Sequence, residues 1–178
     1  MKFLKRFFIV IVGIIALALI VALFVSKDMS ATRDIVINKP KADVFNYIKQ
    51  LKNQNNYSKW SKMDANMKTE FKGTDATVGF ISAWEGNNDV GKGEQEIKKI
   101  VEGERFETEL RFIKPFESKA NAVMTTAAID SAHTKVTWSF DSKMAYPMNL
   151  MKLFMDMDKM IGDDFGVGLA NLKTVMEK

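Results

Sequence analysis

The chain has 178 residues, which is enough for one domain with its own hydrophobic core and too few to expect two. Four of its 26 basic residues precede the first acidic residue, Asp28, so the rest of the chain carries 22 basic and 22 acidic side chains and is neutral overall. A nucleic-acid-binding domain carries a basic surface of its own, so this class is excluded, and the lack of cysteine excludes disulfides, thiolate nucleophiles, zinc ribbons and iron–sulfur ligation.

An apolar segment lies near the N-terminus. The run Phe7–Val25 contains no charged or strongly polar side chain. As a helix it would span about 28 Å, close to the roughly 30 Å hydrocarbon layer of a bilayer. A cleaved signal peptide is the alternative, but its apolar part is usually about 7–15 residues long, and no small-x-small cleavage pattern follows this run. We therefore expect a stub and membrane anchor in residues 1–27 and one domain in residues 28–178.

The charges that flank this run predict its orientation. Three basic residues precede it, whereas the basic residues after it, Lys27 and Arg33, are matched by Asp28 and Asp34. Positive flanks remain on the cytoplasmic side of membranes. We expect a single-pass membrane protein with a cytoplasmic N-terminus and an extracytoplasmic domain.

Short elements are predicted directly after the anchor. Residues 34–37 predict a strand, and Pro40 suits the first turn of the helix that follows. The apolar residues of that helix fall on one face: Val44, Phe45, Ile48 and Leu51. The polar residues 52–61 indicate a loop or a short second helix.

Strand patterns dominate between Met67 and Met144. Apolar and polar residues alternate there with a period of two, and turn sequences separate the runs. One strand before the first helix and six after it predict an antiparallel meander of about seven strands.

The last segment predicts one long amphipathic helix that starts near Pro147. Its apolar residues recur at steps of three and four: Leu150, Phe154, Met157, Ile161, Phe165, Leu169, Leu172 and Met176. Lys152–Asp156 and Lys159–Asp163 are spaced as i,i+4 ion pairs on this helix. The glycines at 162, 166 and 168 indicate a bend, or a place where another group packs close to the backbone.

This order of elements resembles the helix-grip superfamily, which includes START domains, pollen-allergen-like proteins and polyketide cyclase-like (SRPBCC) proteins. The resemblance covers about Ser30 to Lys178. It is carried by the segments Ile35–Pro40 with Val44–Ile48, Asn56–Trp60, Gly91–Gly93 and Gly168–Lys173. It implies an α+β fold in which a curved antiparallel sheet wraps around the C-terminal helix, leaving a cavity for an apolar molecule such as a lipid, sterol or polyketide.

The residues expected to line that cavity are aromatic or apolar. They are Trp60, Phe80, Trp84, Phe106, Leu110, Phe112, Trp138, Phe140, Met148, Met151 and Met155. For Trp60 and Trp84, plain packing under loops is an equal alternative to a place at the cavity mouth. For the methionines, core packing and Cu(I) binding by thioethers are the alternatives, and copper is disfavoured because no histidine or cysteine accompanies them.

The sequence contains no convincing catalytic residue. His133 lies in a predicted turn, and the carboxylate pairs Glu94/Glu96 and Glu107/Glu109 lie on polar strand faces with Lys98 or Arg111 in line. No metal site or cofactor is predicted. We expect a membrane-anchored domain that binds an apolar small molecule or lipid. A cyclase- or hydrolase-type enzyme acting in the same cavity and a non-catalytic structural or partner-binding module are the alternatives.

Overall fold

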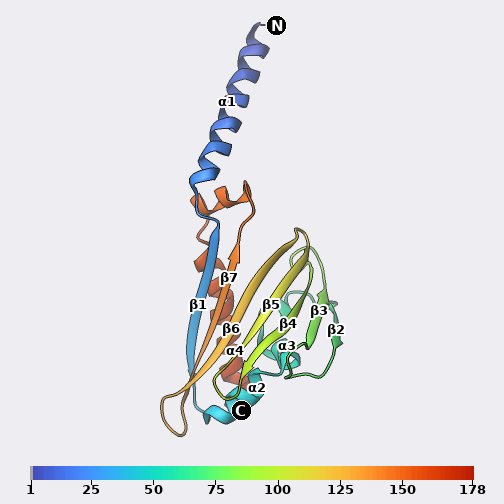
Figure 1. The fold of residues 1–178 in the computed structure, drawn as a ribbon, viewed down its shortest axis with the longest axis vertical. Coiled ribbons are helices and arrows are strands. Elements are labelled where there is room, and N and C mark those ends of the chain that lie inside the picture. Colours follow the sequence, from blue (N-terminus) through green and yellow to red (C-terminus); the bar gives the residue numbers. More distant parts are fainter. Residues whose placement is uncertain (1) are drawn as a thin grey trace.

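The computed structural model describes residues 2–178 and has an apolar helix standing on one end of an α+β domain (Figure 1). Helix α1, Lys2–Phe24, precedes the domain, whose strands and helices follow in chain order. These are β1 (Asp28–Ile37), α2 (Lys41–Ile48), the 3-10 helix η1 (Leu51–Asn53), α3 (Gln54–Tyr57), the 3-10 helix η2 (Trp60–Lys62), β2 (Lys68–Lys72), β3 (Ile81–Glu85), β4 (Lys92–Val101), β5 (Arg105–Lys114), β6 (Ser118–Ala128), β7 (Thr134–Lys143), the 3-10 helix η3 (Met148–Leu153) and α4 (Met157–Met176).

The seven strands form one antiparallel sheet in the order β1-β7-β6-β5-β4-β3-β2. Helix α4 packs against β1 and α3, and the core lies between this helix and the inner face of the sheet. Phe165, Leu169 and Leu172 of α4 are fully buried there, as the three- and four-residue spacing predicts. The predicted helix-grip architecture is therefore confirmed.

The C-terminal helix begins later than the sequence pattern predicts. Residues 148–153 form η3, and α4 starts only at Met157, where the Asp156 side chain accepts a hydrogen bond from the Lys159 backbone N–H. This N-cap satisfies an amide that the first helical turn leaves without a partner, so the chain breaks between the two helices. Phe154, predicted on the buried face, is 86% exposed, and Lys152 binds the Asp28 carbonyl instead of Asp156.

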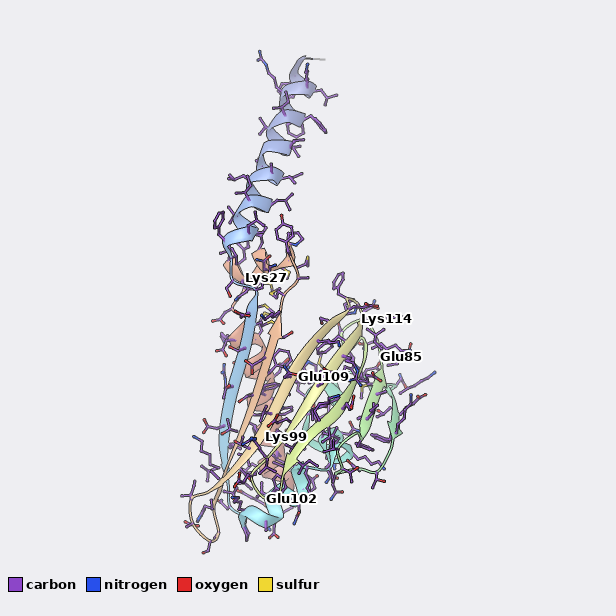
Figure 2. The ribbon with its side chains drawn as sticks, in the orientation of Figure 1. Lys27, Glu85, Lys99, Glu102, Glu109 and Lys114 are labelled. Atoms are coloured by element: carbon purple, nitrogen blue, oxygen red, sulfur yellow. The ribbon has the colours of Figure 1, made fainter. Side chains whose placement is uncertain are left out.

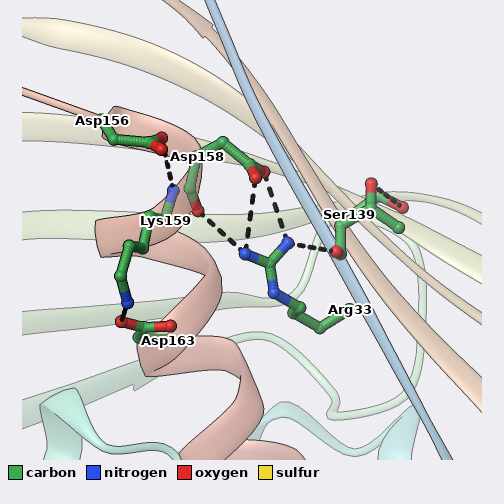
Figure 3. A network of polar contacts seen from close by, with 7 residues as sticks. Arg33, Ser139, Asp156, Asp158, Lys159 and Asp163 are labelled. Carbon is green, nitrogen blue, oxygen red and sulfur yellow. Dashed lines mark hydrogen bonds and ion pairs between the residues drawn. The ribbon is translucent and has the colours of Figure 1, made fainter.

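Two of the three glycines in α4 allow close packing. Figure 3 shows Arg33 of β1 reaching the first turn of α4, where it contacts the carboxylate and the backbone carbonyl of Asp158 at 3.3–3.4 Å. A Cβ at Gly162 would lie 2.1 Å from the Arg33 guanidinium, and one at Gly168 would lie 3.1 Å from the Trp138 ring. The close-packing alternative therefore accounts for these two positions, whereas Gly166 faces open space.

Candidate functional site

A cavity of about 420 Å³ lies between the inner face of the sheet and the segment that runs from η1 to η2, with α4 closing one side. Strands β2 to β7 each contribute to its wall, because alternate residues of every strand point to this face. The connection between β5 and β6 contributes Pro115 and Phe116, which are exposed and therefore lie at the cavity mouth.

Six of the residues predicted to line a cavity lie on this wall: Trp60, Trp84, Leu110, Phe112, Trp138 and Phe140. They come from η2, β3, β5 and β7, so the fold brings together side chains that are far apart in the sequence. Their contact with a ligand remains a prediction.

The other five predicted residues lie elsewhere. Phe80 and Phe106 are buried in the core, outside the cavity wall, and Phe80 stacks on Phe71 with ring centroids 5.9 Å apart. Met148 and Met151 belong to η3 at the foot of α1 and are 45% and 36% exposed. Met155 lies in the turn before α4, beside a shallow hollow at the start of β1. The three methionines thus lie outside the wall of this cavity, because the chain breaks before α4 and the predicted helix does not extend back to residue 148.

An aromatic stack forms one wall of the cavity. The Trp138 and Phe165 rings lie parallel, with centroids 4.4 Å apart and an interplanar angle of 6°. Trp60 meets the edge of this stack, with its ring centroid 5.7 Å from that of Phe165. Phe140 also meets Phe165 at a steep angle, with centroids 6.3 Å apart, so four aromatic rings pack together to make this wall apolar.

Trp84 is held over the sheet rather than free at the mouth. Its ring covers Gly93, where a Cβ would come within 2.6 Å of the indole, and its Nε1–H donates to the Val90 carbonyl at 3.3 Å. The ring also meets the edge of Phe112, with centroids 5.9 Å apart. Trp84 therefore offers the cavity an apolar ring, and its indole N–H is already used.

Gln95 is the buried polar group that sequence reasoning missed. Its Nε2 donates to Thr108 Oγ1 at 2.9 Å, and the Thr108 hydroxyl in turn donates to the Ala122 carbonyl at 3.3 Å. Because the single hydroxyl proton of Thr108 is used on Ala122, Thr108 accepts from Gln95, which fixes the orientation of the amide. The Gln95 carbonyl oxygen is thus left as an acceptor at the cavity wall. A glutamine at an inward position of an alternating strand was the signal that could have found it.

Acid–base groups are missing from the cavity wall as far as residues 2–178 are described. No aspartate, glutamate, histidine, tyrosine or arginine lines it, and Lys114 at the mouth is its one charged residue. Burial raises the pKa of Tyr57 above its usual range, but this phenol points to the sulfur of Met124 at 3.7 Å, in the core. His133 lies in the turn between β6 and β7, where its Nδ1 is 2.8 Å from the Asp130 carboxylate and exposed to solvent.

The carboxylates of β4 and β5 form an ion cluster on the other face of the sheet. The Arg111 guanidinium contacts Glu94 and Glu96 at 2.7 Å and Glu109 at 2.5 Å. Hydrogen bonds from Arg111 lower the pKa of Glu96 and Glu109 below the usual range of glutamate. These groups are ionised and paired at neutral pH, which suits a solvated sheet face and not a proton-transfer site.

Solved structures with the same fold include proteins of several kinds. Norcoclaurine synthase from Thalictrum flavum, in complex with dopamine and hydroxybenzaldehyde, is 8% identical with a TM-score of 0.61, covering 89% of this chain and 92% of that one. Ara h 8.0201 is 11% identical with a TM-score of 0.56, covering 84% and 97% of the two chains. The di-domain ARO/CYC protein BexL is 14% identical with a TM-score of 0.60, covering 83% of this chain and 46% of that one.

No protein-family model matches this chain, and neither does any curated protein sequence. At identities this low, structural likeness establishes the fold alone. The chain therefore has the helix-grip fold that these proteins share.

Proposed function

We propose that this chain is a single-pass membrane protein whose helix-grip domain, residues 28–178, binds an apolar small molecule or lipid in the cavity between sheet and helices. The observation that carries the proposal is the composition of the cavity wall. Aromatic and other apolar side chains make up most of it, and one charged residue, Lys114, lies at its mouth. The remaining polar lining consists of Gln54, Asn55, Thr69, Gln95 and five serines. A cavity of about 420 Å³ falls in the size range of sites for small ligands, about 300–1,000 Å³.

The cyclase- or hydrolase-type alternative is less well supported. General acid–base chemistry needs a titratable group within hydrogen-bond reach of the substrate. Among the described residues 2–178, Lys114 at the mouth is the one titratable group on the cavity wall. Norcoclaurine synthase, which has the same fold, binds dopamine and hydroxybenzaldehyde. This supports ligand binding by the present domain and does not imply that it catalyses the synthase reaction.

The membrane anchor is the second part of the proposal. Within α1, residues Phe3–Phe24 are long and apolar enough to span a bilayer, and nearly all of their side chains are exposed. Exposed leucine, isoleucine and phenylalanine all around a helix indicate surroundings of lipid. We propose that residues 1–27 form the cytoplasmic stub and the anchor, with the domain on the extracytoplasmic side.

Photo-crosslinking in a membrane tests the binding proposal. The full chain would be reconstituted in phosphatidylcholine nanodiscs that contain a diazirine-bearing fatty acid, and crosslinked peptides would be mapped by mass spectrometry. We expect crosslinks to α1 and also to the peptides that carry Trp60 and Trp138. Crosslinks restricted to α1 would refute lipid binding in the cavity.

A pair of substitutions on β6 makes the test specific. Ala122 is buried and lines the cavity, whereas Ala127 lies exposed on the same strand. Ala122→Phe should fill the cavity and abolish the crosslinks to Trp60 and Trp138 peptides, while Ala127→Phe should preserve them. Circular dichroism of both variants establishes that each remains folded.

A further inference from the structure

The end of the domain that carries α1 also carries exposed apolar side chains. Leu153, the last residue of η3, is 55% exposed, and Phe154, which follows it, is 86% exposed. Phe116 at the β5–β6 tip is 72% exposed. We refer to Leu153, Phe154 and Phe116 as the apolar collar. Figure 1 shows that η3 lies at the foot of α1 and that the β5–β6 connection points toward the same end of the molecule.

Hydrogen bonds hold α1 to this end of the domain. The buried Asn149 side chain donates through Nδ2 to the carbonyls of Ala22 at 2.7 Å and Val25 at 2.8 Å. The Tyr146 hydroxyl donates to the Leu19 carbonyl at 3.1 Å. Ala22 lies in the last turn of α1, where carbonyls have no backbone partner within the helix, and Val25 directly follows the helix. The helix is thus docked on η3 and does not hang from a flexible linker.

A docked anchor fixes which end of the domain faces the bilayer. If α1 spans the membrane, η3 and the β5–β6 tip must face the bilayer surface from which α1 emerges. Figure 2 places Lys114, at the end of β5, toward the same end as Lys27, and Glu102 toward the opposite end.

We propose that the apolar collar is a second membrane contact, which inserts into the lipid interface beside α1 and opens the cavity mouth toward the bilayer. This inference rests on the proposed membrane anchor. Phe116 is the central residue, because it is both exposed at the tip and part of the cavity mouth.

The chemistry of the collar suits a lipid surface. Phenylalanine and leucine insert into the membrane interface from surface-bound amphipathic segments, and lysines near the surface are attracted to anionic lipids. Lys114 and Lys119 flank the tip, with Glu117 as the one acidic residue between them. Phe24, the last residue of α1, is 85% exposed as well.

Site-specific fluorescence measures this contact directly, and the chain has no native cysteine to interfere. Single variants Phe116→Cys and Phe154→Cys of the full chain would carry an NBD label in equimolar phosphatidylcholine–phosphatidylglycerol vesicles. Nitroxide-bearing lipids would be the quenchers. Ile129→Cys is the matched control, because Ile129 is 57% exposed in the β6–β7 turn at the opposite end (Figure 1). Ile14→Cys in α1 reports insertion of the anchor itself.

We expect a large loss of fluorescence at positions 14, 116 and 154 and none at 129. Quenching at 14 with no quenching at 116 would overturn the inference while leaving the anchor intact. Absence of quenching at position 14 would overturn the anchor and the inference together. Binding in the cavity is measured separately by the crosslinks to Trp60 and Trp138 peptides, so its failure is distinguishable from either result.

Discussion

Gly93 determines how closely Trp84 packs on the sheet. A Cβ at this position would lie 2.6 Å from the Trp84 ring and 2.7 Å from the Arg111 carbonyl, and the backbone oxygen has no room to move. Gly93→Ala should therefore displace Trp84 and lower the free energy of unfolding by about 1–3 kcal/mol, as overpacking in cores does. Thermal unfolding followed by circular dichroism measures this loss.

The same substitution at Gly166 is its control. No atom outside the helix lies within 4 Å of a Cβ at Gly166, and alanine is favoured over glycine in a helix interior by up to about 1 kcal/mol. Gly166→Ala should raise the unfolding midpoint. Equal midpoints for the two variants would contradict the close packing of Trp84 on Gly93.

Gln95 should select ligands that carry a hydrogen-bond donor. Its carbonyl oxygen faces the cavity wall because Thr108 engages its amide nitrogen. Gln95→Leu should weaken crosslinking by a diazirine fatty alcohol by roughly 5- to 150-fold, the effect of about 1–3 kcal/mol for one lost hydrogen bond. A diazirine alkane should be unaffected.

Gln50→Leu is the matched control for this change, because Gln50 is exposed and bonds only to the Asn46 carbonyl. Equal losses for the alcohol and the alkane in Gln95→Leu would mean that the side chain shapes the cavity and makes no polar contact with the ligand.

At the scale of elements, Arg111 of β5 contacts two carboxylates of β4, Glu94 and Glu96, and one of its own strand, Glu109. Arg111 lowers the pKa of Glu96 and Glu109 in the folded protein relative to the ordinary value of 4.5. A carboxylate with a lowered folded pKa stabilises the fold above its unfolded pKa, and this stabilisation is lost as the pH falls through the folded pKa.

Arg111→Gln should therefore lower the unfolding midpoint clearly at pH 7 and progressively less below pH 4.5, where the glutamates become protonated. Midpoints measured between pH 7 and 3 provide the test. Arg105 is the control, since it contacts only Glu107, at 3.0 Å, so Arg105→Gln should change the midpoint less. A decrease of the unfolding midpoint that is independent of pH would mean that the Arg111 side chain stabilises the fold by packing and not by its charge.

The sequence predicts the sheet better than the start of the C-terminal helix, and the reason is local. Alternation in Phe106–Phe112 depends only on which face of a strand is buried, so it correctly places Leu110 and Phe112 on the inner side. The helical spacing from Leu150 to Met176 continues across the break at residues 154–156, so periodicity alone does not detect it. Asp156, a strong N-cap residue, was the available signal.

The cavity itself follows from an arrangement that no single segment encodes. Trp138 and Phe165 meet at 4.4 Å only because β7 and α4 pack together, and Trp60 joins them from η2. Phe80 and Phe106 are aromatic, as many of the wall residues are, yet they fill the core. Which inward residues border a hollow depends on the curvature of the sheet, and that is a property of all seven strands.

At the scale of the whole molecule, we expect Asn149 to determine whether α1 and the domain move as one body. It is fully buried and donates hydrogen bonds to the carbonyls of Ala22 and Val25. Tyr146, just before η3, donates another to the Leu19 carbonyl of α1. Asn149→Ala would leave the Ala22 and Val25 carbonyls without these partners. Unpaired buried carbonyls are costly, so the end of α1 should leave η3 to reach water.

Spin labels at Ile20→Cys on α1 and Lys119→Cys on β6 would report this motion in nanodiscs. The distance between the two labels would be measured by pulsed electron paramagnetic resonance. We expect a narrow distance distribution in the otherwise native chain and a broad one after Asn149→Ala, with reduced lipid quenching at position 116. Asn171→Ala is the control, because it removes a similar bond, from Nδ2 to the Tyr57 carbonyl at 3.0 Å, far from the anchor along the chain. A distribution that stays narrow in Asn149→Ala would show that apolar contacts alone hold the anchor. The orientation of the cavity mouth would then not depend on the Asn149 cap.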